Sequence, residues 1–420
     1  MNIINKIKSF IKKHVYIRKI ARKLNFYIKK MKYRIITRNT NIDENLIIFA
    51  SFGGKSYCDS PKAIYNYLIN DGKYNNYKFI WAFKDMQKHQ FLEENRNTKV
   101  MDIKSKEFFK TLGKAKYWIV NYKIQDYIFP RENQVFVQCW HGTPLKRLGC
   151  DLEHFNNAMN SISEIRQRYH LEASKFSYFI SPSKFATEKF ISTWDLEKIN
   201  KTDIIIEEGY PRNDFLINYT KQDIKRIKET LGIDNLNKKI ILYAPTYRDN
   251  QHSTEIGYTY ETKVNFDKLK SELSDEYIIL FRAHWLVAQS FNFEKYKDFV
   301  IDVSNYDDIN ELYIVSDMLI TDYSSVFFDY ANLKRPIIFY MYDLEDYRDN
   351  IRGFYLDLEE LPGKIVKKED ELIGKIKLLT DKFAYDEKYK KFNKKFNYLD
   401  DGQATKRVIE KIFKIEGANI

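Results

Sequence analysis

The chain has 420 residues, of which 44% are hydrophobic, and this size and composition can bury the cores of two domains. With only 14 Gly and 8 Pro, it is neither collagen-like nor of low complexity. Its three cysteines, Cys58, Cys139 and Cys150, are too few for a disulfide framework and lack the paired spacing of a zinc finger, which favours a reducing compartment.

The formal net charge of +12 is concentrated at the start of the chain. Residues 1–42 contain 13 Lys or Arg and no Asp or Glu, so the remainder is close to neutral. A local basic segment on a neutral body argues against a broad nucleic-acid surface, and we expect no nucleic-acid partner. No run reaches the roughly 18 apolar residues that span a bilayer, and the start lacks the apolar core of a signal peptide. We therefore expect a protein that is neither secreted nor membrane-spanning.

The first predicted element is a basic amphipathic arm at residues 1–42. Its apolar residues recur at helical spacings, with Lys and Arg between them. Such a helix, or pair of helices, can bind an anionic membrane surface, to which each basic residue contributes about 1 kcal/mol. The alternative is a helix that packs on its own domain. The apolar residues are Ile3, Ile7, Phe10, Ile17, Ala21, Leu24, Ile28 and Met31.

From Leu46 onward, short apolar runs alternate with helix-periodic stretches, which is typical of α/β units with a parallel sheet. The turn-rich stretch 208–214 separates two sets of runs and is interpreted as a linker. We expect Rossmann-like lobes at 43–208 and 209–400 and a C-terminal helix within 401–420. The runs are 46–50, 79–83, 117–120, 135–138 and 178–180 in the first set, and 240–243, 277–281, 299–303, 318–320 and 337–340 in the second.

A histidine follows the run that ends at Gln138. In open parallel sheets ligands bind beyond the carboxyl ends of the strands, so His141 is placed where chemistry is expected. An imidazole titrates near neutral pH and can act as a general base toward a hydroxyl. A histidine that only caps a turn is an equally good interpretation of this residue by itself.

Second-lobe residues at equivalent strand ends suit a phosphate group. Arg282 and His284 follow the run 277–281, and together they can neutralise negative charge. Ser324 and Ser325 come where a strand turns into a helix, whose first turn offers free N–H groups to an anion. Ordinary N-capping is the alternative for the serines. Arg352 adds a cation near the same edge, although an isolated arginine is more often a surface residue.

Several catalytic motifs are absent from the sequence. It contains no phosphate-binding P-loop, no Gly-x-Gly-x-x-Gly and no His-Glu-x-x-His, which removes support for P-loop hydrolysis, dinucleotide redox and zincin chemistry. The seven histidines are scattered, and their spacing assembles no metal cage. We therefore expect no cofactor and no metal in the reaction.

Seven segments together resemble the CDP-glycerol:poly(glycerophosphate) glycerophosphotransferase family of teichoic acid synthesis. They occur in the family order between about residues 46 and 366, and the ordered set is far more specific than any one motif. The segments are Ser51–Lys62, Gln138–Lys146 with Gly149 and Asp151, Gly209–Asp214, Tyr243–Asp249, Arg282–His284, Ile320–Ser325 and Arg352–Tyr355.

The resemblance implies an α/β GT-B fold of two Rossmann-like lobes with the active site between them. His141 and His284 correspond to the two essential histidines of the family. In that scheme His141 takes the acceptor hydroxyl proton from the first lobe, while the second lobe holds the CDP-alditol donor. The donor-binding residues so implied are Arg282, Thr321, Ser324, Ser325 and Arg352, and the acceptor-side residues are Gly142, Thr143, Lys146 and Asp59.

The resemblance also implies the reaction: glycerol phosphate passes from CDP-glycerol to a lipid-linked polymer precursor of teichoic acid or capsule type, and CMP is released. The acceptor would be a glycan on a polyprenyl diphosphate. The enzyme would then lie peripherally on the cytoplasmic face of the bacterial cell membrane, with the N-terminal arm on anionic lipid.

Two departures from the family pattern leave alternatives open. Trp285 stands where the family commonly has Pro, so the donor could carry ribitol phosphate or another alditol phosphate. Only the basic arm precedes the lobes, which makes priming with one unit as plausible as chain extension. A sugar-nucleotide glycosyltransferase of the same fold and a non-catalytic membrane scaffold are the remaining alternatives.

Overall fold

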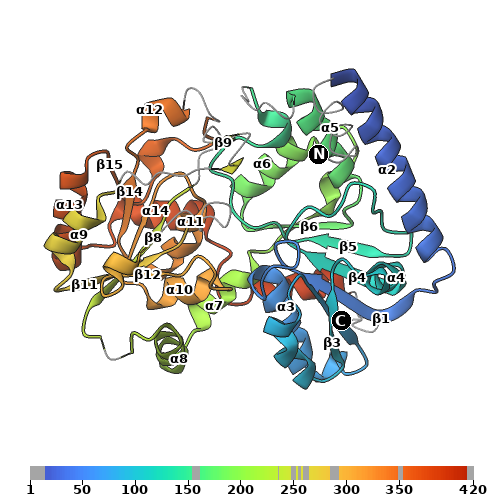
Figure 1. The fold of residues 1–420 in the computed structure, drawn as a ribbon, viewed down its shortest axis with the longest axis horizontal. Coiled ribbons are helices and arrows are strands. Elements are labelled where there is room, and N and C mark those ends of the chain that lie inside the picture. Colours follow the sequence, from blue (N-terminus) through green and yellow to red (C-terminus); the bar gives the residue numbers. More distant parts are fainter. Residues whose placement is uncertain are drawn as a thin grey trace, which may run out of the picture.

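The computed structural model describes residues 15–153, 161–234, 236–246, 252–253, 257–258, 264–283, 293–348 and 353–413. Two parallel β-sheets, each with helices on both faces, form two lobes that lie side by side (Figure 1). This confirms the predicted two-lobed α/β fold.

The first lobe contains a seven-stranded sheet in the order β3-β2-β1-β4-β5-β6-β7, with every neighbouring pair parallel. Successive residues of β1 pack into two separate cores, Ile48 on one face and Ile47 and Phe49 on the other. Because both faces are buried, the central strands are continuous apolar runs in the sequence. The strands are β1 (Asp43–Ala50), β2 (Lys78–Phe83), β3 (Thr98–Asp102), β4 (Ala115–Val120), β5 (Val135–Gln138), β6 (Tyr178–Ser181) and β7 (Ile205–Glu207).

The second lobe contains a six-stranded parallel sheet in the order β12-β11-β8-β13-β14-β15. A short antiparallel pair, β9 (His252–Ser253) and β10 (Gly257–Tyr258), lies outside it. The sequence analysis did not predict that pair, nor β3, β7 and β15. These last three are edge strands with partly exposed residues, so they lack a continuous apolar run. The strands are β8 (Lys239–Ala244), β11 (Tyr277–Phe281), β12 (Val300–Asp302), β13 (Met318–Thr321), β14 (Ile337–Tyr340) and β15 (Lys364–Val366).

Helices connect the strands, and several begin at side-chain caps that the sequence supplies. Ser161 and Thr220 each form a capping box, and Ser183 accepts a hydrogen bond from Ala186 N–H. The α-helices are α2 (Val15–Thr37), α3 (Asp59–Asn70), α4 (Lys106–Lys114), α5 (Ile162–Ala173), α6 (Lys184–Trp194), α7 (Asp214–Asn218), α8 (Lys221–Leu231), α9 (Phe266–Leu273), α10 (Ile309–Val315), α11 (Val326–Tyr330), α12 (Leu344–Asp346), α13 (Glu369–Lys382), α14 (Glu387–Phe396) and α15 (Ala404–Ile412).

Helix α2 runs along the outer edge of the first lobe (Figure 1). It packs there through Tyr33 and Thr37, both buried, and a Cβ added to Gly113 of α4 would collide with Thr37. Its outer face is different, because seven large apolar side chains at helical spacings are between 40% and 69% exposed. They are Ile17, Ile20, Leu24, Tyr27, Ile28, Met31 and Ile35. No helix in the described ranges is long and apolar enough to cross a membrane.

The C-terminal helix returns to the first lobe. Phe413, just beyond α15, packs edge-on and tilted against Tyr74, Tyr77 and Tyr117 at ring-centroid distances of 5.7, 5.8 and 4.5 Å. Asp214 caps the start of the helix by accepting hydrogen bonds from Ala404 N–H and Thr405 N–H, at 2.9 and 2.7 Å. The chain therefore crosses between the lobes twice, once before α7 and once before α15.

A buried arginine joins the lobes at the first crossing. Arg212 lies in a short 3₁₀ turn (Pro211–Asn213) and is 4% exposed. Its guanidinium bonds both carboxylate oxygens of Asp329 in the second lobe at 3.1 Å and reaches Asp59 in the first lobe at 3.4 Å. The ring of Tyr210 lies 3.9 Å from the guanidinium carbon. Nearby carboxylates hold the pKa of Arg212 well above its usual range despite burial.

A third carboxylate, Asp400, extends this buried cluster. Its Oδ2 accepts hydrogen bonds from Asn213 Nδ2 at 2.7 Å and from Asn332 Nδ2 at 2.8 Å. Burial raises the pKa of Asp400 to about 7, and the charge of Asp329 adds to the rise. The amide of Asn213 also donates to Asp329 at 3.1 Å, so the cluster is continuous across both crossings.

The Asp400 carboxyl should make stability depend on pH. An unfolded aspartate titrates near pH 3.9, so between about pH 4 and about pH 7 the folded state keeps a proton that the unfolded state has lost. The free energy of unfolding should therefore fall as pH rises through this window. We expect Asp400→Asn, which keeps an oxygen for the two amides, to reduce that fall and to raise the melting temperature at about pH 8. Thermal unfolding followed by circular dichroism measures both.

The neighbouring exposed Asp401, which pairs with Arg407, provides the matched control as Asp401→Asn. This control should retain the decline in stability between about pH 4 and about pH 7. Equal pH dependence of Asp400→Asn and the unmodified chain would contradict the assignment.

Candidate active site

Three strand ends of the first sheet meet around His141. Asn121 follows β4, and its side-chain Oδ1 accepts a hydrogen bond at 2.8 Å from the N–H of Phe52, which follows β1. The backbone carbonyl of Asn121 accepts a hydrogen bond, also 2.8 Å long, from Nδ1 of His141, which follows β5. Loops from three adjacent strands are thereby tied together at the carboxyl edge of the sheet.

Aromatic rings enclose two sides of the His141 imidazole. The ring centroid of Trp140 lies 4.2 Å away and that of Phe52 lies 5.7 Å away. Trp140 has a φ of 51°, a left-handed conformation that costs a side chain about 1 kcal/mol or more. A hydrogen bond from Trp140 N–H to Gln138 Oε1 and edge-on packing against Trp194 hold it there. The turn that presents His141 is thus fixed by its neighbours.

The hydrogen bond to Asn121 settles which ring nitrogen of neutral His141 carries the proton. A carbonyl oxygen can only accept, so Nδ1 is the donor and Nε2 keeps a lone pair. His141 is solvent-accessible, but protein atoms packed around the ring lower its pKa by desolvation. The Asn121 bond and the charge of Asp59 oppose this effect, and Arg212 adds to it. The His141 ring thus anchors its turn through Nδ1, and its other nitrogen, Nε2, remains basic.

Gly142 brings the loop of His141 against the second lobe. A Cβ added to Gly142 would collide with Oγ of Ser325 and lie 3.2 Å from its Cβ. Any larger residue would therefore have to displace the serine. The close approach of these two segments places the candidate base of one lobe beside the predicted donor site of the other.

Ser324 and Ser325 are half-buried at the start of α11. Ser325 occupies the N-cap position, and its backbone carbonyl accepts a hydrogen bond from Phe328 N–H. Its hydroxyl makes no capping hydrogen bond, so ordinary N-capping does not explain a serine at this position. The predicted strand-to-helix transition is present, although α11 is only five residues long.

Two other predicted donor residues bond within the second lobe. Thr321 is fully buried, and its hydroxyl donates to Ala244 O at 2.8 Å, which ties β13 to β8. Arg282 Nη1 donates to the carbonyls of Val303 and Tyr306 at 3.0 and 2.8 Å. Both side chains therefore position strand ends at the carboxyl edge of the second sheet.

The predicted acceptor-side residues lie where the lobes meet. Thr143 is buried, and Asp59 reaches Arg212. Lys146 forms an isolated antiparallel bridge with Phe354 of the second lobe, and its Nζ lies 5.8 Å from the ring centroid of Tyr347. The backbone of the His141 loop is thus paired directly with the second lobe.

Tyr355 takes part in a set of hydrogen bonds that joins this loop to residues 353–355 of the second lobe, and we call this set the clasp. The N–H of Tyr355 donates to Leu145 O at 2.8 Å, and Arg147 N–H donates to Gly353 O at 3.3 Å. The Tyr355 hydroxyl donates to Asp151 and lies 2.9 Å from Thr193 Oγ1. Sequence analysis assigned no role to Tyr355.

Asn121 was also missed by sequence analysis. The available signal was a polar residue directly after the apolar run 117–120, since a polar residue shortly after a strand had also singled out His141. His284 and Arg352, with Trp285, lie outside the described residues.

The fold and the site define the class of the protein. Two Rossmann-like lobes, with a histidine after a strand of one and two serines after a strand of the other, and with these two segments in contact, are the arrangement of a GT-B transferase. The chain matches the CDP-glycerol:poly(glycerophosphate) glycerophosphotransferase family over residues 31–414, and it belongs to that family.

Relatives and solved structures agree with this assignment. A teichoic acid poly(glycerol phosphate) polymerase of Bacillus spizizenii is 41% identical over 372 residues, 88% of this chain and 92% of the relative. A protein of the same description from Bacillus subtilis is 38% identical over 93% of this chain, which spans 52% of that relative's length. The structure of a variant of the wall teichoic acid polymerase TagF, soaked with CDPG, superimposes with a TM-score of 0.81 at 36% identity and covers 94% of this chain and 97% of its own.

The environment of His141 predicts a measurable titration. We expect its imidazole to titrate below the ordinary value of about 6.5 and to be neutral at pH 7. The measurement is the pH dependence of the ring C–H signals in an NMR spectrum, assigned by their loss in His141→Asn. A His141 signal that titrates above about 6.5 would contradict the neutral tautomer described here.

Proposed function

We propose that this chain transfers glycerol phosphate from CDP-glycerol to a lipid-linked polymer precursor of teichoic acid or capsule type. An acceptor hydroxyl oxygen attacks the phosphorus that carries glycerol, and the bond from that phosphorus to the bridging oxygen breaks. CMP leaves with the bonding electrons, and the hydroxyl proton passes to the base. The family of the chain supports CDP-glycerol as the donor.

One observation carries the mechanistic part of the proposal, namely the neutral tautomer of His141 beside Ser325. Nδ1 is occupied by the Asn121 carbonyl, which leaves the lone pair of Nε2 to take the acceptor proton. Gly142 lies against Ser325, so base and donor site meet at the boundary between the lobes. A general base must be within hydrogen-bonding reach of the proton that it removes, and this geometry favours that arrangement.

The second lobe is proposed to hold the diphosphate of the donor. The hydroxyls of Ser324 and Ser325 and the charge of Arg282 are suited to anionic oxygens. His284 and Arg352 join this set through the family resemblance, and Thr321 acts by fixing the strand end. Gly142, Thr143, Lys146 and Asp59 would shape the acceptor side.

The exposed face of α2 supports a peripheral position on an anionic membrane, where a polyprenyl-linked acceptor is found. The seven exposed apolar side chains form one stripe, and Lys19, Lys23 and Lys32 are exposed among them. A helix that lies in the interface has this combination of an apolar stripe and basic flanks. The opposite face packs on the first lobe, as the alternative interpretation of the arm predicts, and the proposal assigns the exposed face to the membrane.

Incubation with candidate donors and a membrane fraction that contains acceptor tests the reaction. We expect CMP release with CDP-glycerol and little with CDP-ribitol. UDP release from UDP-sugars in the absence of CMP release would contradict the proposal. With CDP-glycerol, His141→Ala should lower the transfer rate by about 10² or more while donor affinity is retained, because a base acts on the acceptor.

Leu378→Ala is the control for this experiment, since it truncates an exposed side chain on α13, outside the His141 loop. Its transfer rate should stay near that of the unmodified chain. Donor affinity lost together with activity in His141→Ala would assign this residue to substrate holding.

Substitution of the exposed stripe tests the membrane contact. We expect the triple change Ile20→Ser, Leu24→Ser and Met31→Ser to weaken binding to anionic phosphatidylglycerol vesicles by about tenfold or more, because each side chain loses apolar area that the lipid would cover. Vesicle co-sedimentation measures the change. Leu378→Ser, at another exposed apolar side chain, is the control and should bind normally. Unchanged binding of the triple variant would remove the membrane role of α2.

A further inference from the structure

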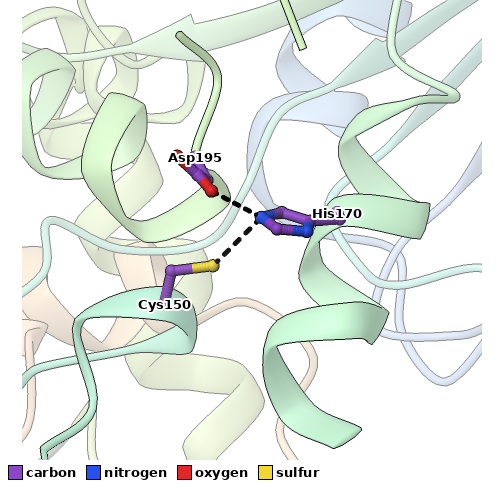
Figure 2. Close-up of side chains that lie close together, drawn as sticks. All are labelled: Cys150, His170 and Asp195. Carbon is purple, nitrogen blue, oxygen red and sulfur yellow. Dashed lines mark hydrogen bonds and ion pairs between the residues drawn. The ribbon is translucent and has the colours of Figure 1, made fainter. Parts of the chain in front are cut away.

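Cys150, His170 and Asp195 converge on one point of the first lobe, outside the transferase site (Figure 2). Cys150 lies in a 3₁₀ turn (Gly149–Asp151), His170 in the last turn of α5 and Asp195 at the C-cap of α6. The three residues are 20 and 25 positions apart in the chain, so only the tertiary structure brings them together. The proposed transfer reaction uses none of them.

The distances between the donor atoms are those of a metal site. His170 Nε2 lies 3.6 Å from Cys150 Sγ and 2.8 Å from Asp195 Oδ2, and one ligand atom from each residue lies within 4.8 Å of the other two. With Zn–S near 2.3 Å and Zn–N and Zn–O near 2.0 Å, a tetrahedral zinc separates sulfur from nitrogen by about 3.6 Å and nitrogen from oxygen by about 3.3 Å. The nitrogen-to-oxygen separation has to widen by about 0.5 Å, and the partly exposed Asp195 side chain could supply this by a small rotation.

The geometry also distinguishes a metal site from a catalytic triad. In a Cys-His-Asp triad the imidazole contacts the nucleophile through one nitrogen and the carboxylate through the other. Here the same nitrogen, Nε2, faces both the sulfur and the carboxylate, as Figure 2 shows. Three donor atoms directed at a common point suit a cation. They do not suit a triad, because the proton relay of a triad needs both ring nitrogens of the histidine.

The backbone holds the three side chains in place. Gly149 has a φ of 53°, and a Cβ there would collide with Thr193 O and the ring of Tyr169, so the turn of Cys150 packs tightly on α5 and α6. Asp195 is in the left-handed region, where its N–H bonds Ile191 O and Ser192 O at the end of α6. Preorganised ligands lose little entropy when a metal binds.

The surroundings favour a cation. The three residues line a hollow of about 740 Å³ together with Asp151, Glu188, Glu197, Arg166 and Lys198. With Asp195 included, the hollow has four carboxylates and two cationic side chains. It therefore carries an excess of negative charge even while the Cys150 thiol is protonated. The hollow opens to solvent and has room for a water molecule as a fourth ligand.

We propose that Cys150 Sγ, His170 Nε2 and an Asp195 oxygen bind Zn²⁺, with water at the fourth position. A thiolate and an imidazole select zinc over Mg²⁺ or Ca²⁺, which prefer oxygen ligands only. On binding, the thiol releases its proton to solvent and the imidazole contributes its Nε2 lone pair. This zinc would lie outside the transferase site and take no part in phosphate transfer.

The site is one residue from the clasp between the lobes. Asp151, next to Cys150, accepts hydrogen bonds from Tyr355 of the second lobe and from Ser192 and Thr193 of α6. A metal bound at Cys150 fixes the turn from which Asp151 reaches Tyr355. Zinc should therefore raise the stability of the whole chain.

Metal binding by the untagged 420-residue chain tests the proposal. After removal of metals with a chelator, we expect one zinc per chain in competition against a chromophoric chelator, and a higher melting temperature with zinc than without it. Cobalt in place of zinc should give a sulfur-to-metal charge-transfer band. Cys58 and Cys139 are buried and unable to supply that band.

Cys150→Ser should abolish the cobalt band and weaken zinc binding at least about tenfold, because a thiolate ligand is lost. Asp195→Asn should weaken zinc binding while the fold is kept, since Asn tolerates the left-handed conformation. Glu197→Gln, which changes the hollow without removing a ligand, should bind zinc as the unmodified chain does. Zinc binding that is absent from the unmodified chain, or unaffected by both Cys150→Ser and Asp195→Asn, would overturn the proposal.

Discussion

The pairing of Arg212 with Asp59 and Asp329 is the interaction on which the relation between the lobes depends. The guanidinium is buried between one carboxylate from each lobe, and a buried charge that loses its partner destabilises a protein by about 3–5 kcal/mol. Because Arg212 lies in the linker, this penalty resists separation of the lobes at their crossing. Asn213 and Asp400 extend the same network to the second crossing before α15.

The position of the lobes in turn determines the site. Gly142 and Ser325 come from different lobes, and their close packing requires the relative placement that the buried cluster and the clasp of Tyr355 maintain. The loop between Gln138 and Asp151 is involved in each of these features. It carries the candidate base, contacts Ser325, pairs with residues 353–355 and ends at the proposed zinc ligand Cys150. One segment thus couples the chemistry to the contacts that hold the lobes together.

Local strain in this loop has a structural explanation. Trp140 adopts a left-handed conformation, and the hydrogen bond that its N–H donates to Gln138, together with packing against Trp194, offsets the cost. The result is an imidazole whose Nδ1 is committed to a carbonyl while Nε2 stays basic. The tautomer is therefore set by the backbone of the adjacent strand end and requires no carboxylate partner.

The sequence by itself determined the α/β class, the central strands of both sheets and the strand-end position of His141. Central strands are buried on both faces, so each one is a continuous apolar run, and a polar residue after such a run is conspicuous. Edge strands such as β3 and β15 escaped detection because they are half-solvated. Only the tertiary structure decided that Gly142 meets Ser325, that Asn121 fixes the His141 tautomer, and that Cys150, His170 and Asp195 converge. These contacts join residues far apart in the chain, and the packing of the elements that carry them, which no local pattern encodes, brings them together.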